Sequence, residues 1–248
     1  MPALSTLPTD PQIQQIAVDL ACAFRFSARL NMHESVANHF SVAIGESGEQ
    51  FLINRAGVHF SRVKASELLL VDTACGQKNS GVDPTAWALH SAIHREVPSA
   101  RCLLHVHSKY ATVLSTLEDS RLLPIDQNSM RFYNRYSIDK CFDGMGLSDE
   151  AQRISQLLVA AKPILIMGNH GVMVTGGSVA QAFDELYYFE RACETYITAL
   201  MTGRPLRIVS DAIAAKTAQQ WADYTGFSQA HFDELKRILD EEGSNYAS

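Results

Sequence analysis

The sequence predicts an α/β sandwich whose central sheet is mostly antiparallel or mixed. Expected helices and strands alternate loosely along the chain, and an early hairpin is mixed in with them. A regular succession of strand–helix–strand units, which would indicate a parallel sheet, is not evident in the pattern. With 248 residues, 46% of them hydrophobic, the chain can bury one sizeable core, so we expect a single domain over 1–248.

The first half of the chain is expected to hold two helices and a hairpin. Apolar residues recur at helical spacing after Asp10-Pro11, which suits an N-cap and first turn, and Asp83 is the expected N-cap of a second helix that stops before Pro98. The expected elements are a helix at 11–32, hairpin strands at 40–44 and 51–53, a short helical segment at 64–68, a strand at 69–71 and a helix at 84–95.

The second half is expected to be richer in helix. The expected elements are a strand at 102–106, a helix at 108–116, an apolar run at 164–167, a long amphipathic helix at 179–201 and a terminal helix at 227–239. The long helix should end at the Thr-Gly-Arg-Pro stretch 202–205, because glycine and proline favour helix termination. Residues 206–248 carry more charge and a weaker apolar pattern.

Charge and cysteine content exclude several classes of function. The formal charge of −6 and the absence of a Lys/Arg run argue against nucleic acid or an anionic membrane as a partner. No apolar stretch has the length of a membrane span, and the N-terminus does not resemble a signal peptide. The five cysteines are widely spaced and form no C-x-x-C pair. We therefore expect a cytoplasmic protein that acts on a small molecule.

Three histidines in apolar settings are the most informative residues of the chain. His105 and His107 form a His-x-His pair on an expected strand, where side chains two apart point to the same face. His170 follows a distant apolar run in an Asn-His-Gly sequence. Three such imidazoles are the ligand number of a catalytic metal site that keeps one position open. The alternative is that these are separate, hydrogen-bonded core or turn histidines. That interpretation would be favoured for a single such histidine, but not for this combination of three.

A set of motifs extends over about 12–206: Trp87-x-x-His90 and the stretches 104–112, 168–172, 182–183 and 190–194. In this combination the sequence resembles the class II aldolase/adducin family, and 38–41 and 122–125 favour its adducin-like branch. The resemblance implies an α/β/α sandwich with a central mainly antiparallel sheet, a divalent metal held by His105, His107 and His170, and a homotetramer with sites between subunits. Residues 207–248 would be a C-terminal helical extension.

Departures from the aldolase pattern put the usual aldol route in doubt. The position before Trp87, where the resemblance implies a catalytic Glu, holds Ala86, which can neither transfer a proton nor bind a cation. The expected phosphate loop reads Asn-Arg-Ala-Gly at 54–57, so the small hydroxyl donor is lost and Arg55 appears before Gly57. A planar guanidinium suits a carboxylate or another planar anion, although a solvated loop arginine is equally compatible with the sequence.

Further polar residues are candidates for the site. Asn38 and Gly57, with Arg55, are expected to bind substrate; His39 and Ser41 fall in the same expected substrate-binding turn. His90 is a catalytic candidate that the resemblance places next to the metal, whereas His94 is expected at the surface or an interface. The remaining candidates, each of which also has a structural interpretation, are Asn128 for substrate, Arg131 for charge, Tyr133 for catalysis and His59 for an anion.

The favoured function is a divalent-metal-dependent carbon–carbon lyase acting on a small hydroxy- or oxo-carboxylate. Zinc is the expected ion, with manganese, iron or cobalt as alternatives. Retro-aldol cleavage and decarboxylation both deliver electrons to an oxygen near the metal, and the alanine at position 86 tilts the choice slightly toward decarboxylation. Two other classes stay open: a non-haem iron oxygenase on the same fold, and a non-catalytic adducin-like interaction module.

Overall fold

A single mixed sheet forms the centre of the computed structural model, which describes residues 7–76, 81–145, 147, 149–158 and 162–248. The strands are β1 (His39–Ile44), β2 (Gln50–Ile53), β3 (Leu69–Asp72), β4 (Cys102–Val106), β5 (Tyr136–Asp139), β6 (Ile164–Met167) and β7 (Gly171–Gly176). They lie in the order β3-β2-β1-β4-β7-β6-β5. Neighbours are antiparallel except β5 and β6, which are parallel. The mainly antiparallel sheet predicted from the sequence is therefore confirmed.

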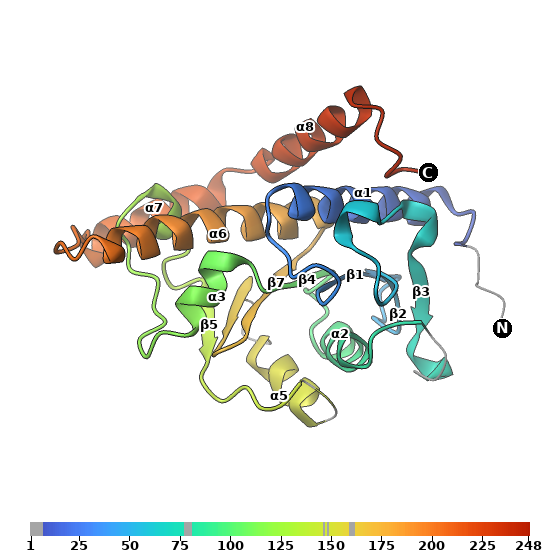
Figure 1. The fold of residues 1–248 in the computed structure, drawn as a ribbon, viewed down its shortest axis with the longest axis horizontal. Coiled ribbons are helices and arrows are strands. Elements are labelled where there is room, and N and C mark those ends of the chain that lie inside the picture. The colour runs from blue at the N-terminus through green and yellow to red at the C-terminus, as the bar shows by residue number, and fades with distance from the viewer. Residues whose placement is uncertain (1–6, 77–80, 146, 148, 159–161) are drawn as a thin grey trace.

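Helices cover both faces of this sheet, as Figure 1 shows. They are α1 (Pro11–Arg29), α2 (Pro84–Glu96), α3 (Lys109–Ser115), α4 (Gln127–Arg131), α5 (Asp149–Leu158), α6 (Val179–Met201), α7 (Asp211–Asp223) and α8 (Phe227–Glu241). α1 and α6 lie on one face with α8 outside them, and α2 and α5 lie on the other. Within the described residues, no helix has both the length and the apolar character needed to cross a membrane.

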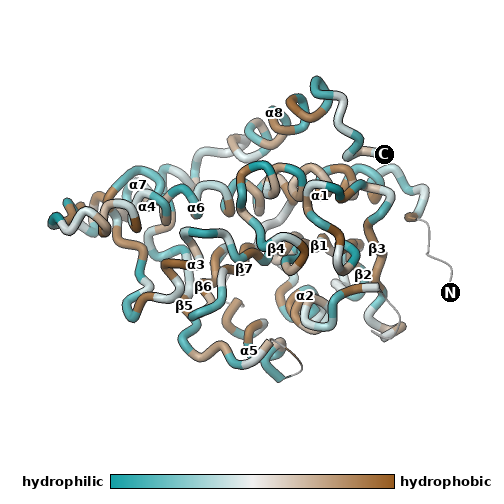
Figure 2. The backbone as a smooth tube through the Cα atoms, viewed as in Figure 1, coloured by the Kyte–Doolittle hydropathy of each residue, from teal (hydrophilic) through white to brown (hydrophobic). Residues whose placement is uncertain are grey.

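Side-chain alternation along β4 divides the core into two parts. Cys102, Leu104 and Val106 join the large cluster formed with α1 and α6, whereas Leu103 joins the cluster formed with α2 and α5. The tube in Figure 2 is accordingly apolar along the central strands. Because side chains two apart share a face, His105 lies on the α2 side of the sheet.

Most helices and strands expected from the sequence are present, with corrections at their ends. The first helix ends at Arg29 and not at Met32, because the chain turns sharply through Asn31, whose φ is +56°. The segment expected at 64–68 is a single 3-10 turn, η2 (Ala65–Glu67). The sequence did not predict α4, β5, α5, β7 or α7.

A buried carboxylate joins α6 to the chain segment that leaves β4. Glu190 is 7% exposed, and its two oxygens accept hydrogen bonds from the Ser108 hydroxyl at 2.7 Å and from the backbone N–H groups of Tyr110 and Ala111 at 2.8 and 2.9 Å. These donors belong to the first turn of α3, which has few other acceptors within reach of its N–H groups. Glu190 therefore fixes the backbone immediately after His107.

Replacing this carboxylate should destabilise the fold. Glu190→Gln removes the charge from three buried hydrogen bonds and is expected to lower the free energy of unfolding by about 2 kcal/mol, measured by urea denaturation. Glu194→Gln is the matched control on the same helix, because Glu194 pairs with the exposed Arg191 and should matter by less than about 0.5 kcal/mol. Equal stability of the two variants would contradict the structural role given to Glu190.

Candidate metal centre

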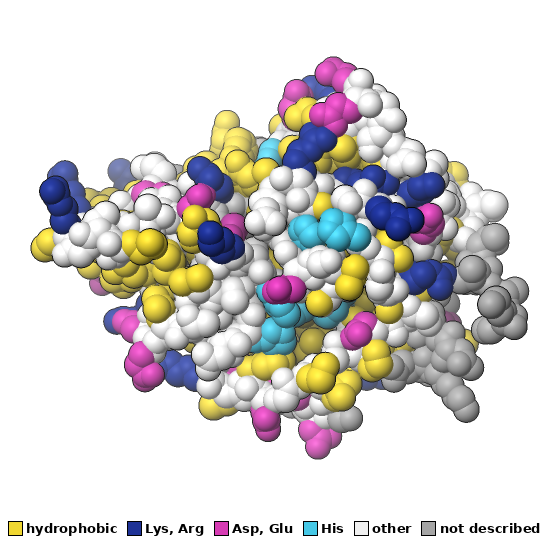
Figure 3. Space-filling model, viewed as in Figure 1, with side chains coloured by type: hydrophobic (Ala, Val, Ile, Leu, Met, Phe, Trp, Pro, Cys, Tyr) yellow, Lys and Arg dark blue, Asp and Glu magenta, His cyan; other side chains and the backbone are white. Residues whose placement is uncertain are grey.

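The three histidines predicted to bind metal lie together where the central strands of the sheet end. His105 is near the end of β4, His107 follows that strand, and His170 lies in the tight turn between β6 and β7. One ligand atom from each lies within 4.8 Å of the others. Histidine side chains reach the surface near the middle of the face drawn in Figure 3. Within the cluster His105 is buried, whereas His107 and His170 are only partly buried, so the cluster is open on one side.

The hydrogen bonds of the first two rings leave their inner nitrogens free to bind an ion. His105 Nδ1 donates to the Val172 carbonyl at 3.1 Å, so a neutral ring carries a lone pair on Nε2. His107 Nδ1 lies 3.4 Å from Glu34 Oε2, which favours the same tautomer. The two Nε2 atoms are then 3.1 Å apart with a lone pair on each. Two nitrogen ligands of a tetrahedral zinc ion are separated by about 3.4 Å, close to the distance seen here. A cation between the two nitrogens would also remove the repulsion between their lone pairs.

The third ring and the charge state of all three also fit a metal. His170 Nδ1 is buried and has no hydrogen-bond partner among the described residues. Burial lowers the pKa of His170 to about 4 and that of His105 well below its usual value. It also lowers the pKa of His107, against the opposing effect of Glu34. Neutral imidazole is the form that binds a metal, so the site is prepared for one near pH 7.

Two residues of the β6–β7 turn allow the rings to converge. Asn169, before His170, has a φ of +56°, a conformation that asparagine tolerates better than most residues. Gly171 is required because β4 and the His107 ring approach its Cα closely. A Cβ there would lie 2.5 Å from the Val106 carbonyl oxygen and 2.9 Å from His107 Cδ2. The left-handed residue of this turn is therefore Asn169, and Gly171 is required for space.

Behind the metal site, a buried chain of hydrogen bonds runs from β1 into α2. His39 is the direct cross-strand neighbour of His105, and the two ring centroids are 4.8 Å apart. His39 Nδ1 is 2.7 Å from His90 Nε2. His90 Nδ1 contacts the Ser41 hydroxyl, which is 2.7 Å from Nε2 of His94.

The far end of this chain fixes the proton positions along it. His94 Nδ1 lies 3.1 Å from the Ala100 carbonyl, which can only accept. In neutral rings, Ser41 must then donate to His94 and accept from His90, so that His90 accepts from Nδ1–H of His39. His39 is left with an unprotonated Nε2. Burial supports the neutral forms, because it lowers the pKa of His94 and of His39 to about 3 and that of His90 well below its usual value.

A small cavity lies where the substrate-binding turn was predicted. Its volume is about 30 Å³, and its lining includes Asn38, His39, Gly57, Asp83 and Ala86. Asn38 Oδ1 accepts from the backbone N–H of His107 at 3.3 Å, whereas its buried Nδ2 has no partner among the described residues. The methyl group at position 86 thus faces the same space as a free amide donor and the His39 ring.

The other predicted site residues are distributed over the fold. Arg55 lines a second, larger cavity described below. Asn128 lies in α4, which packs on α6 and α7, and Tyr133 lies near Asp211, whose hydrogen bond raises the Tyr133 pKa. Arg131 is paired with Asp184 at 2.7 Å. None of these four has a described contact with the three histidines, so their roles in a site stay predictions.

The structure also tests where His94, His90 and His59 lie. His94 was expected at the surface or an interface, and this is wrong: its side chain is 3% exposed and belongs to the buried chain. His90 is fully buried, and its described hydrogen bonds join it to His39 and Ser41 and not to the three clustered histidines. His59 caps the 3-10 turn η1 (Phe60–Arg62) by accepting from the Ser61 N–H, as a loop histidine with a local structural role.

Glu34 was not predicted as a residue of the site. It lies in the irregular segment between α1 and β1, where no periodic pattern marks it, and it becomes relevant only because the fold brings that loop beside His107. Its side chain is 62% exposed, so solvent screens its effect on the ring.

Fold and site together define a member of the class II aldolase/adducin family. The family described as "Class II Aldolase and Adducin N-terminal domain" matches residues 18–197, so the chain belongs to it. A relative from Pseudomonas aeruginosa named "Putative aldolase class 2 protein" is 31% identical over 99% of both chains. Human beta-adducin is 31% identical over 65% of this chain and 23% of its own length.

Solved structures give the same assignment. An aldolase II superfamily protein from Pseudomonas syringae has a TM-score of 0.88 and 30% identity, with 97% of this chain and 98% of that chain covered. The L-fuculose 1-phosphate aldolase from Glaciozyma antarctica has a TM-score of 0.79 and 24% identity, covering 98% of each chain, and shares the fold.

Acid should weaken the metal-free fold through the buried histidine chain. The His94 pKa is about 3 in the folded chain and 6.5 in the reference state, so between these values the unfolded chain binds more protons and stability falls as pH falls. From pH 7 to pH 5 this one residue is expected to remove about 2 kcal/mol from the free energy of unfolding. Urea denaturation in EDTA at both pH values measures it. His94→Gln should reduce the pH dependence by that amount, and an unaltered dependence would contradict the assignment.

Proposed function

We propose that this chain is a divalent-metal-dependent lyase that cleaves a carbon–carbon bond in a small hydroxy- or oxo-carboxylate. The observation that carries the proposal is the pair of facing His105 and His107 Nε2 atoms, 3.1 Å apart, with His170 completing the set. Membership of the class II aldolase/adducin family supports the same class of reaction.

His105, His107 and His170 would hold the ion. Zinc is the proposed metal, and manganese, iron and cobalt are the alternatives that imidazole ligands also suit. When bound, such an ion supplies Lewis-acid polarisation of substrate oxygens. Phe142 packs against His170 with ring centroids 4.2 Å apart, so the proposed site has an apolar neighbour on that ring.

His39 is proposed to carry out the proton transfer that a Glu at position 86 would perform and that Ala86 cannot. The chain of hydrogen bonds behind it leaves Nε2 unprotonated, and His39 lines the same cavity as Ala86. Asn38 Nδ2, a buried donor without a described partner, is proposed to hold a substrate oxygen. A base in this position restores what retro-aldol cleavage requires, so the proposal includes aldol cleavage and decarboxylation equally.

A homotetramer with sites between subunits is part of the proposal. The cavity beside His39 holds about 30 Å³ in one chain, whereas sites for small molecules commonly have about 300–1,000 Å³. A neighbouring subunit placed over the open side would supply the remaining walls and is the proposed source of further substrate contacts.

Metal analysis tests the centre directly. Protein purified without added metal or a chelating tag is expected to contain about one equivalent per chain, because the described residues hold one set of three ligands. His105→Ala and His170→Ala should each lose almost all of it while retaining the far-UV CD spectrum, because both side chains lie at the edge of the core. His59→Ala, on a loop histidine outside the cluster, is the matched control. Full metal content in either cluster variant would refute the ligand assignment.

Proton exchange tests the chemistry. The metal-loaded protein is expected to catalyse exchange of the hydrogens next to the carbonyl of a short oxo-acid such as pyruvate for deuterium in D₂O. The exchange is measured by NMR. His39→Gln should keep its metal and lose about 100-fold or more in exchange rate, with His59→Gln as control. Retained exchange in His39→Gln would remove the assigned base.

The same preparation separates the alternative classes. Iron in the protein together with oxygen consumption would indicate an oxygenase, and no metal even after addition of Zn²⁺, Mn²⁺ or Fe²⁺ would indicate an adducin-like interaction module. Retro-aldol cleavage is assayed with L-fuculose 1-phosphate, taken from the name of the structural relative, and with unphosphorylated hydroxy-acids. Either substrate class turning over would support the lyase.

A further inference from the structure

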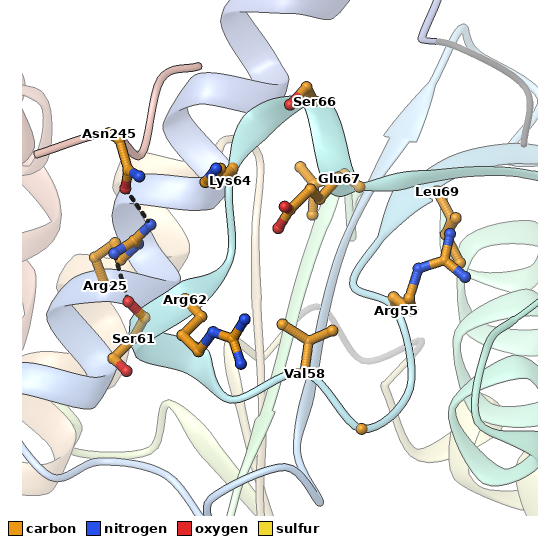
Figure 4. A pocket seen from close by; sticks show the side chains of 12 residues that line it. Arg25, Arg55, Val58, Ser61, Arg62, Lys64, Ser66, Glu67, Leu69 and Asn245 are labelled. Carbon is orange, nitrogen blue, oxygen red and sulfur yellow. Dashed lines mark hydrogen bonds between the residues drawn. The ribbon is translucent and has the colours of Figure 1, made fainter.

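A larger cavity lies beside α1, away from the groups assigned to the metal centre. It has a volume of about 670 Å³, within the range common for small-molecule sites. Its walls come from α1, the segment after β2, the turns η1 and η2, and Asn245 near the C-terminal end (Figure 4). None of its lining residues is a histidine of the cluster, so its ligand would be held by a different set of side chains.

The cavity concentrates positive charge in a chain whose formal charge is −6. Arg25, Arg55, Arg62 and Lys64 line it, against one carboxylate, Glu67. Figure 4 shows Arg62 and Glu67 reaching into the same space, with Arg55 across from them. Lys and Arg side chains also gather on this part of the surface in Figure 3.

Three of the four cations have no partner in the described part of the chain. Arg25 is held in place: its Nε donates to the Val63 carbonyl at 2.8 Å, its Nη1 donates to the Ser61 carbonyl, and its Nη2 donates to Asn245 Oδ1 at 2.9 Å. The side chains of Arg55, Arg62 and Lys64 make no described hydrogen bond or ion pair. Their donors are available to a ligand.

Backbone hydrogen bonds from the C-terminal residues hold one wall of the cavity. The N–H of Ala65 donates to the Tyr246 carbonyl at 2.8 Å, and that of Ser66 donates to the Ser248 carbonyl at 3.1 Å. Tyr246 is 2% exposed, so this segment is packed against the body of the protein. The cavity is therefore preformed, which reduces the entropy cost of binding.

We propose that this cavity is a second ligand site, for a small molecule with several negative charges such as a phosphate ester or a polycarboxylate. The three cationic groups, Arg55 in the loop after β2 and Arg62 and Lys64 two residues apart at η1 and η2, match a ligand whose charges are spread over more than one group. Arginine binds phosphate and carboxylate oxygens in pairs. Gly57 borders both this cavity and the one beside His39, so the two sites share one loop.

Calorimetric titration of the full chain with inorganic pyrophosphate and with citrate tests the proposal. At least one of the two should bind, and the affinity should fall as ionic strength rises. Arg62→Gln/Lys64→Gln should weaken binding by about tenfold or more, because each lost cation removes a charge-assisted hydrogen bond. Arg62→Lys/Lys64→Arg keeps the charge and should bind within a few-fold of the parent. Arg204→Gln/Arg207→Gln, outside the cavity, is the control for net charge.

The titrations are repeated in His105→Ala/His107→Ala, in which the anions cannot bind through a metal at the three-histidine set. Binding retained in that variant and lost in Arg62→Gln/Lys64→Gln supports a separate site. Binding lost in the histidine variant, equal weakening by Arg204→Gln/Arg207→Gln, or no binding of either anion would overturn it. Thermal unfolding of each variant shows that a loss of binding is not a loss of fold.

Discussion

The pairing of β4 with β1 on one side and β7 on the other determines where every histidine of the centre lies. It sets His39 directly opposite His105, and it brings the turn containing His170 to the end of the strand that precedes His107. A slip of one residue in β4 would turn His105 into the cluster formed with α1 and α6 and Leu104 toward the α2 side, and would disrupt both clusters. The burial of Leu103 and Leu104 on opposite faces therefore enforces the geometry of the ligands.

Local spacing was enough to predict that His105 and His107 lie on one face, because a His-x-His pair on a strand shares one face whatever the rest of the fold does. The elements with strong periodicity, α6 above all, were predicted for the same reason. The elements that were missed have short or interrupted patterns. β7 starts and ends at a glycine, and α5 has only 10 residues and pairs through Arg153 with Asp139 at 2.6 Å, a contact that no local pattern indicates.

The hydrogen bonds that link His39 to His90, Ser41 and His94 could not be predicted from the sequence, because they join one face of β1 to one face of α2. His94 was assigned to a surface since nothing near it in sequence indicates a partner, and only the packing of α2 on β1 supplies Ser41. Likewise, Arg55 and Gly57 were predicted as parts of one substrate site. The structure places the Arg55 side chain in the basic cavity, whereas Gly57 borders both that cavity and the one beside His39.

Gly171 shows that a residue without a ligand atom can decide whether a donor set exists. Only a hydrogen fits between its Cα and the neighbouring strand, and the first atom displaced by a methyl group would belong to the backbone of β4 or to the His107 ring. A homologue that keeps all three histidines but carries alanine at this position would satisfy any ligand-based search pattern. Its imidazoles would nevertheless stand too far apart to share an ion, so an inventory of metalloproteins compiled from ligands alone would count it wrongly.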